Sequence, residues 1–372
     1  MKDWIPIIRP DVGFDEVEES IREVLGTGIL TSGPYVAAFE KSVADRVGVG
    51  HAVATTSATT ALHLALAAVG LGPGDEVLLS DFTYPATANA VIQTSATPVF
   101  VDSEKADFSM DPEHAASLVT ERTRVIMPVD PLGQPANHAS LEVLAAGAGA
   151  HLIVDAACSL GASRGGRECG GHGDMGCISF HPRKVVTCGE GGMVTTDDSA
   201  LAERLRLLKN HGAQRTTSGI LEFVEPGFNY RLSEVPAILG LAQMQRLDRI
   251  LADRQRTAGR YGEALGGIPG VRVPEAPPDT VWSYQSYVVV LDESLDRNDV
   301  IAKMAAEGIE TTIGTYACHQ HPAFSRWIPE IGGLPNSARF ADHSLTLPLV
   351  PHMDPSEVER VVESLSTLLG SL

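Results

Sequence analysis

Short apolar segments alternate with helical segments from Val53 to about Thr196, and this alternation limits the possible folds more than any other feature of the chain. The predicted helices are Thr59–Val69, Ala86–Gln93, Pro112–Leu118, Leu141–Ala148 and Ala200–His211. The predicted strands are Val77–Ser80, Pro98–Asp102, Val125–Val129, Leu152–Asp155, Cys177–Phe180 and Met193–Thr196. Strands separated by helices predict an α/β fold with a mostly parallel sheet covered on both faces. Ligands of such sheets bind at the carboxyl ends of the strands, where the pattern places Asp155 and Ser179.

The rest of the chain predicts flanking helices and a second, smaller domain. Further expected elements are helices at Asp15–Leu25 and Tyr35–Val47, one long helix at Ser233–Arg254, a surface connection at Pro269–Thr280, a strand at Ser286–Leu291, and helices at Arg297–Glu307 and Pro355–Leu369. We predict a large domain over residues 1–250 and a smaller domain over residues 251–372. The N-terminal segment is expected to pack on the smaller domain.

Charge and cysteine content restrict the partners and the compartment. The net charge of -19 argues against general binding to nucleic acid or to an anionic membrane, so an anionic substrate needs a local basic pocket. Met1-Lys2-Asp3 opens without a signal-peptide pattern, and no apolar run reaches transmembrane length. The five cysteines include no CxxC pair, which favours reduced thiols in a cytoplasmic protein. We expect no metal centre.

Lys184 and Asp155 stand where a covalent aldehyde cofactor could bind. Lys184 lies in SFHPRKVVTCGEGGM, between a strand end and glycines that permit close backbone approach. Asp155 ends the apolar segment LIVD, where a buried carboxylate needs a cationic partner such as a pyridinium N–H. The structural alternatives are a solvated hairpin lysine and a helix-capping aspartate. Together the two residues indicate pyridoxal phosphate (PLP), which requires both an amine and a carboxylate.

The phosphate and the ring of PLP require further partners. Ser57–Thr59 precedes an apolar helix whose first N–H groups form an anion site, and Ser179 could add a hydroxyl. Tyr84 follows a strand and offers an aromatic ring. The turn GFNYR carries Asn229 and Arg231. Helix capping, core packing and ordinary turn chemistry are the alternatives for these residues.

Seven ordered motifs resemble those of the DegT/StrS-type sugar aminotransferases, which are PLP enzymes of fold type I. The motifs are TTSATTALHLAL, GPGDEVLLSDFTYPATANAV, ATPVFVDSE, IVDAACSLGA, SFHPRKVVTCGEGGMVTTDD, LKNHGA and GFNYRLSEVPAILGLAQ. The resemblance runs from about Gly33 to Arg254 and continues more weakly to the C-terminus. It implies a large domain with a mostly parallel seven-stranded sheet, a smaller α+β domain, PLP as cofactor and aminotransferase activity.

The resemblance also implies roles for individual residues. Lys184 resembles the Schiff-base lysine, and Asp155 resembles the partner of the pyridine nitrogen. Asn229 matches an asparagine that the neighbouring subunit provides to the cofactor phosphate, which implies a homodimer with shared active sites. The other matches are Ala58, Thr59 and Ser179 as phosphate ligands, Tyr84 as the ring-stacking aromatic, and Gln134 without an assigned role.

Cys158 is a departure from the family pattern. It stands where members often carry Gln or His near the phenolic oxygen of the cofactor. A thiol is a weak donor, so the hydrogen bond made at this position is in doubt.

The implied reaction moves an amino group from an amino acid, expected to be L-glutamate, to a nucleotide-linked keto sugar. The first expectation is a 4-keto-6-deoxyhexose on dTDP, UDP or GDP, for a secondary metabolite such as an antibiotic or for a surface glycan. A 3-keto sugar or a keto-cyclitol is the alternative. Competing hypotheses are a PLP-dependent sugar dehydratase, whose relatives replace the lysine by histidine, and a regulatory homologue without turnover. Candidate substrate-binding residues are His181, Arg231 and His319, with Arg183, His321 and Trp327 as further possibilities.

Overall fold

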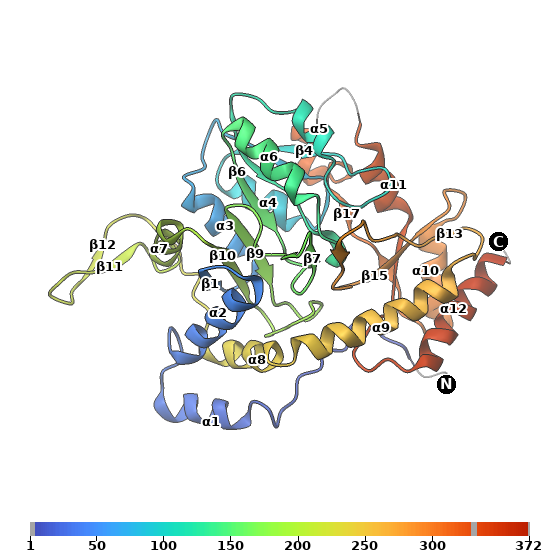
Figure 1. The fold of residues 1–372 in the computed structure, drawn as a ribbon, viewed down its shortest axis with the longest axis horizontal. Helices are drawn as coiled ribbons and strands as arrows, with labels where there is room; N and C mark the ends of the chain where they lie inside the picture. Colours follow the sequence, from blue (N-terminus) through green and yellow to red (C-terminus); the bar gives the residue numbers. More distant parts are fainter. Residues whose placement is uncertain (1–3, 329–332, 371–372) are drawn as a thin grey trace.

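The computed structural model describes residues 4–328 and 333–370, and a seven-stranded sheet forms its centre (Figure 1). The strand order is β1-β10-β9-β6-β5-β2-β4. The pairs between β9 and β4 are parallel, whereas β10 is antiparallel to both β1 and β9. The strands are β1 (His51–Thr55), β2 (Glu76–Ser80), β4 (Thr97–Val101), β5 (Thr123–Met127), β6 (His151–Asp155), β9 (Met175–Ser179) and β10 (Gly192–Thr196). The predicted α/β class and mostly parallel sheet are confirmed.

Helices cover both faces of this sheet because successive strand residues point to opposite sides. Ile126 joins the core cluster on one face, and its neighbour Val125 joins the cluster on the other. The first face is covered by α2 (Pro34–Val47), α5 (Pro112–Ser117), α6 (His138–Ala148) and α8 (Glu234–Met244). The second is covered by α3 (Ala58–Ala68), α4 (Ala86–Gln93) and α7 (Ser199–Leu208).

The topology brings the predicted site residues to one edge of the sheet. Strands β6 and β9 are parallel neighbours, so their carboxyl ends lie side by side. Asp155 is the last residue of β6 and Ser179 is the last residue of β9. The prediction that both stand at strand ends is confirmed.

A second, four-stranded sheet lies in the C-terminal part, in the order β13-β15-β18-β16. Its core also contains Ile5, which forms a bridge with Ile309. The division of the chain at residue 250 stays a prediction. The elements here are β13 (Val271–Arg272), β15 (Tyr287–Leu291), α10 (Arg297–Ala306), β16 (Thr312–Ile313), α11 (Pro335–His343), β18 (Ser344–Leu347) and α12 (Pro355–Gly370). Strand β13 lies inside 269–280, which was expected to be only a connection.

The prediction of one helix at Ser233–Arg254 is wrong. Helix α8 ends at Met244, and α9 (Leu247–Leu265) begins after a break. The Arg246 guanidinium at the break donates to the carboxylate of Asp11 at 2.9 Å and to its backbone carbonyl at 2.7 Å. Because apolar residues continue through the break, the local pattern contains no signal of this long-range contact.

The remaining elements are short or peripheral. The hairpin of β11 and β12 projects from the body of the molecule (Figure 1). No helix in the described part of the chain is long and apolar enough to cross a membrane. Residues 1–3, to which the signal-peptide expectation applies, lie outside the described residues. These elements are α1 (Glu18–Thr27), β3 (Phe82–Thr83), η1 (Pro131–Gly133), β7 (Ser163–Arg164), β8 (Arg167–Glu168), β11 (Ala213–Arg215), β12 (Leu221–Phe223), β14 (Thr280–Val281), β17 (Tyr316–Ala317), η2 (Cys318–Gln320) and η3 (Pro322–Trp327).

Candidate active site

Asp155 is a buried carboxylate with few partners. Its Oδ2 accepts a hydrogen bond from Thr87 Oγ1 at 2.7 Å, and its Oδ1 accepts one from the Ala157 N–H at 3.2 Å. Burial raises the pKa of Asp155 above its ordinary value, although these hydrogen bonds and the charge of Lys184 act in the opposite direction. A protonated ring nitrogen would stabilise the ionised carboxylate, so the environment of Asp155 fits the partner of a pyridinium N–H.

Lys184 lies in the loop between β9 and β10, and its amine approaches the same region. Its Nζ donates to Cys158 Sγ at 3.0 Å, and Cys158 follows β6 by three residues. The structure therefore brings together the amine, the acid and the thiol that the sequence singled out. The role of each toward the cofactor stays a prediction.

Two glutamines that the sequence analysis missed hold the lysine loop in place. Gln285 Nε2 donates to the carbonyl of Arg183 at 2.8 Å. Gln243 accepts from the N–H of Thr187 at 3.1 Å and also donates to the carbonyl of Thr187. These partners are 102 and 56 positions apart in the chain, so no local pattern could have identified them.

The start of α3 combines a helix cap with a candidate anion site. The Ser57 hydroxyl accepts from the N–H of Thr60, whose hydroxyl accepts from the N–H of Ser57, which forms a capping box. The cap leaves the N–H groups of Ala58 and Thr59 without acceptors inside the helix, because they belong to its first turn. The capping alternative and the anion site are therefore compatible.

Strand β10 brings Ser179 to this anion site. Gly192 pairs with Ser179 and lies against the backbone of Ser57 and Ala58 so closely that a Cβ at position 192 would overlap it. Position 192 therefore requires a glycine if β10 is to lie this close to the first turn of α3. The three predicted phosphate ligands, Ala58, Thr59 and Ser179, converge in the structure.

Tyr84 and Asn229 lie at exposed positions. Tyr84 is 66% exposed, with its ring centroid 6.1 Å from that of Tyr316. Asn229 forms a bridge with Asn210, whose side chain accepts from Arg231 Nη1 at 2.8 Å. Among the described residues, no hydrogen bond joins Asn229 or Arg231 to Asp155 or Lys184. An exposed Asn229 is available to a second subunit.

His319 is bound to a buried acid through its Nδ1 and its backbone N–H, and its role toward a substrate stays a prediction. Its Nδ1 lies 2.5 Å from Asp81 Oδ2, and its backbone N–H donates to Asp81 Oδ1 at 2.8 Å. Burial alone lowers the pKa of His319, but the hydrogen bond and the charge of Asp81 raise it above its ordinary value. The structure thus assigns His319 a structural partner that the sequence analysis missed.

The other candidate residues have local partners. His181 is half-buried, which lowers the pKa of its imidazole, and its Nδ1 accepts from the N–H of Arg183 at 3.3 Å. The ring of His321 lies 5.3 Å from that of Tyr316. Trp327 packs against the core cluster of the second sheet face. Gln134 is buried, with its Oε1 lacking a partner among the described residues.

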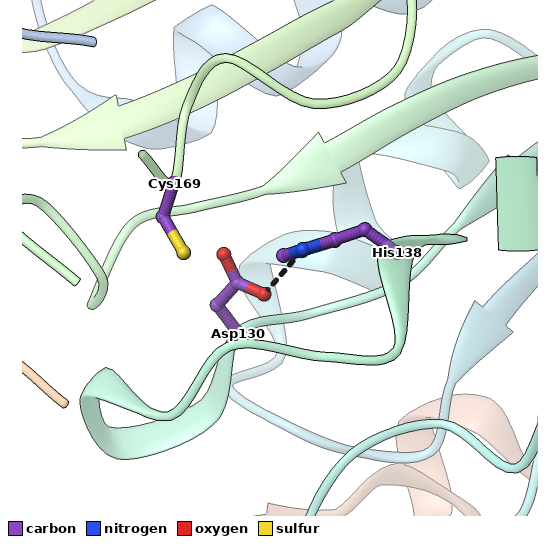
Figure 2. Close-up of side chains that lie close together, drawn as sticks. All are labelled: Asp130, His138 and Cys169. Carbon is purple, nitrogen blue, oxygen red and sulfur yellow. Dashed lines mark hydrogen bonds and ion pairs between the residues drawn. The ribbon is translucent and has the colours of Figure 1, made fainter. Parts of the chain in front are cut away.

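A buried polar cluster lies behind Asp155, formed by Asp130, His138 and Cys169 (Figure 2). Asp130 accepts from His138 Nε2 at 2.7 Å and from the Ser159 hydroxyl at 2.7 Å, and its own N–H donates to the carbonyl of Asp155 at 3.0 Å. Burial alone raises the pKa of Asp130, but His138 and the hydrogen bonds lower it below its ordinary value. Both carboxylate oxygens of Asp130 thus accept hydrogen bonds. Because Ser159 follows Cys158 directly, its bond to Asp130 supports the turn that carries Cys158.

Comparisons with known proteins decide the family. The model of the DegT/DnrJ/EryC1/StrS aminotransferase family matches residues 13–366. The chain belongs to this family. A curated relative, the spore coat polysaccharide biosynthesis protein SpsC of Bacillus subtilis (strain 168), is 35% identical over 379 residues, which cover 98% of this chain and 97% of that protein.

Solved structures of family-like enzymes superpose on nearly the whole chain. DesV of S. venezuelae, solved with a ketimine intermediate, gives a TM-score of 0.92 at 33% identity and covers 99% of both chains. The putative sugar aminotransferase Spr1654 of Streptococcus pneumoniae, in its PLP form, gives 0.93 at 26% identity and covers 99% of this chain and 98% of that one. The chain is therefore a PLP-dependent sugar aminotransferase of fold type I.

The residues present fit this cofactor. A buried carboxylate that needs a cation, an amine 3.0 Å from Cys158 and a helix N-terminus with unused N–H groups supply partners for the ring nitrogen, the aldehyde and the phosphate. Cys158, the residue that departs from the family pattern, contacts the Lys184 amine through its thiol.

Proposed function

We propose that this protein transfers an amino group from L-glutamate to a nucleotide-linked keto sugar, with a dTDP-, UDP- or GDP-linked 4-keto-6-deoxyhexose as the preferred acceptor. The observation that carries the proposal is the approach of the Lys184 amine to Cys158 beside the buried Asp155. The name of SpsC, a polysaccharide biosynthesis protein, and that of Spr1654, a putative sugar aminotransferase, support the sugar as acceptor. All five cysteines are free thiols, which supports a reducing compartment such as the cytoplasm.

Each residue of the candidate site would have its own role in this reaction. PLP, when bound, supplies an aldehyde for the donor nitrogen and a ring that takes up electrons from the neighbouring carbon. Lys184 would hold the cofactor and, once released, take a proton from the substrate carbon and return it. Asp155 would keep the ring nitrogen protonated, with its carboxylate oriented by Thr87. The N–H groups of Ala58 and Thr59, together with Ser179, would bind the phosphate.

The central experiment removes the amine at position 184. We expect the purified protein to be yellow and borohydride to attach the cofactor to Lys184. Lys184→Ala should lose this attachment and nearly all transamination, whereas Lys41→Ala, at an exposed lysine paired with Asp45, should retain both. Full turnover by Lys184→Ala would contradict the mechanism.

A panel of nucleotide keto sugars tests the acceptor. The aminated form of the enzyme should react fastest with 4-keto-6-deoxyhexoses, as read from the return of the cofactor colour. A preference for 3-keto sugars or keto-cyclitols would show that the proposed acceptor is wrong and that the proposed amino transfer is right. A deoxygenated product without amino transfer would indicate a dehydratase, against which the presence of Lys184 argues. A coloured protein that reacts with no donor would indicate a regulatory homologue.

The proposed homodimer predicts complementation between inactive variants. If Asn229 reaches the phosphate site of the neighbouring subunit, the Lys184→Ala and Asn229→Ala defects fall in the same site of a mixed dimer, and the other site keeps both residues. Mixing the two after mild dissociation should therefore restore part of the activity, because one of the two sites becomes intact. No recovery in a mixture shown to contain the heterodimer would contradict the shared site.

A further inference from the structure

A basic cavity of about 50 Å³ lies beside the lysine loop. Its walls come from Ile7–Asp11, from the loop around Lys184, from α9 and from β18. Three arginines line it: Arg9, Arg183 and Arg254. In a chain with a net charge of -19, this local excess of positive charge favours the binding of an anion.

Arg254 is a buried cation that forms no close ion pair among the described residues, although the charge of Asp253 acts favourably on it. It is 7% exposed, and its Nε and Nη2 donate to the carbonyls of Tyr284 and Gln285 at 2.7 and 2.6 Å. No carboxylate of the described residues lies within 4.0 Å of its guanidinium. Burial lowers the pKa of Arg254 to about 10. An anion in the cavity would stabilise this charge, because an unpaired buried charge is costly.

The acidic residue in the cavity wall is already paired elsewhere. Asp11 accepts from Arg246 at 2.9 Å through Oδ2, and the same oxygen lies 3.5 Å from His352 Nε2. Among the described residues that line the cavity, Asp11 is the only acid. Arg246 also lies 3.3 Å from Glu16, so it is shared between two acids, but three arginines against one lining acid still give the cavity a net positive charge.

We propose that this cavity binds a carboxylate group of the amino donor, an inference that rests on the proposed function. A volume of about 50 Å³ accommodates a carboxylate-sized group, whereas a nucleotide needs a pocket of roughly 300 Å³ or more. Gln285 and Ser286 line the same wall and add polar groups. Because Lys184 also lines the cavity, a donor anchored here has its amino group next to the lysine loop.

The first experiment measures binding without turnover. Glutarate has the two carboxylates of the donor but no amino or keto group, so its binding to the holoenzyme can be followed by calorimetry. Arg9→Gln and Arg183→Gln, both at exposed positions, should each weaken its binding about tenfold. Arg249→Gln, an exposed arginine on α9 outside the cavity wall, should leave it unchanged.

The second experiment tests the buried arginine and the class of anion. Arg254→Lys should raise the KM for glutamate several-fold with little change in the KM for the nucleotide sugar, and a thermal denaturation curve confirms that the variant is folded. Excess phosphate or dTDP should not displace glutarate. If Arg9→Gln, Arg183→Gln and Arg254→Lys all bound glutarate as tightly as the parent enzyme does, the inference would be overturned, and displacement by dTDP would overturn it as well.

The two proposals fail in distinguishable ways. If glutarate binding depends on the three arginines but no keto sugar is aminated, the carboxylate site stands and the proposed acceptor is wrong. If keto sugars are aminated from glutamate but substitution of the three arginines leaves the affinity for glutarate unchanged, the proposed function stands and the proposed carboxylate site is wrong.

Discussion

Thr87 orients Asp155, the proposed partner of the cofactor ring nitrogen. Its side chain is fully buried, and its hydroxyl donates to Asp155 Oδ2 at 2.7 Å. The hydroxyl of Thr83 lies 2.9 Å from that of Thr87 and continues the chain of hydrogen bonds. A hydrogen bond to a charged group contributes about 1.5–3 kcal/mol, so this contact restricts the carboxylate strongly.

Removing the Thr87 hydroxyl should therefore slow the reaction without unfolding the protein. We expect Thr87→Val to lower kcat by about tenfold or more, because Asp155 loses its fixed orientation toward the ring nitrogen. Thr87→Ser keeps the hydroxyl and should stay close to the parent enzyme. Single-turnover absorbance changes measure both variants. Equal rates for the Val and Ser variants would show that the hydroxyl has no positioning role.

Glu234 couples two helices that are far apart in the sequence. It is the first residue of α8 and is fully buried, and its carboxylate accepts from the N–H groups of Gly33, Tyr35 and Val36 at 2.8, 2.8 and 3.2 Å. These N–H groups lie at the start of α2, where a negative charge is favoured by the helix dipole. One side chain thus caps α2 from the neighbouring helix.

Neutralising this cap should cost measurable stability. We expect Glu234→Gln to lower the free energy of unfolding by about 1.5–3 kcal/mol, because a charge-assisted acceptor for three N–H groups is replaced by a neutral amide. The matched control is Glu23→Gln, whose exposed carboxylate accepts from the Tyr35 hydroxyl, and its effect should stay below about 0.5 kcal/mol. Urea unfolding compares the two variants. Equal effects would exclude a special role of Glu234.

At the scale of the whole molecule, one contact joins the central sheet to the C-terminal part. Strand β3 pairs with β17, and Asp81 next to β3 binds His319 just beyond β17. The same short segment continues into Tyr84, the predicted ring-stacking residue. The ion pair therefore helps to set the position of Tyr84 relative to the C-terminal part.

This contact should make stability depend on pH. Asp81 raises the pKa of His319 above its ordinary value of 6.5 in the folded protein, so the stabilisation is fully present below 6.5 and is lost as pH rises through the folded pKa. Burial also raises the pKa of Asp81 above its ordinary value, although the hydrogen bond and the charge of His319 act in the opposite direction. The difference in unfolding free energy between the parent protein and His319→Gln should therefore shrink as pH rises above 6.5 through the folded pKa of His319. A constant difference would contradict the assignment.

Much of the site could be predicted because its residues stand in local patterns. Asp155 ends an apolar segment and Lys184 precedes a glycine cluster, so each is recognisable within its own stretch. His319 was also singled out, but its bond to Asp81 was not, since the two are 238 positions apart. The long helix predicted at 233–254 is interrupted at Arg246, whose partner Asp11 is likewise far away, 235 positions along the chain.

The sequence by itself was enough to predict most elements of the central sheet and the fold class, and to single out Asp155 and Lys184 as candidates, because the periodicity of apolar residues and the ends of strands are local properties. Only the tertiary structure decided that Thr87 orients Asp155, that Gln243 and Gln285 hold the lysine loop, and that three arginines meet in one cavity. These contacts join residues that are far apart along the chain. A hydrogen bond requires that donor and acceptor lie close together in space, and local sequence patterns do not show which distant residues do so.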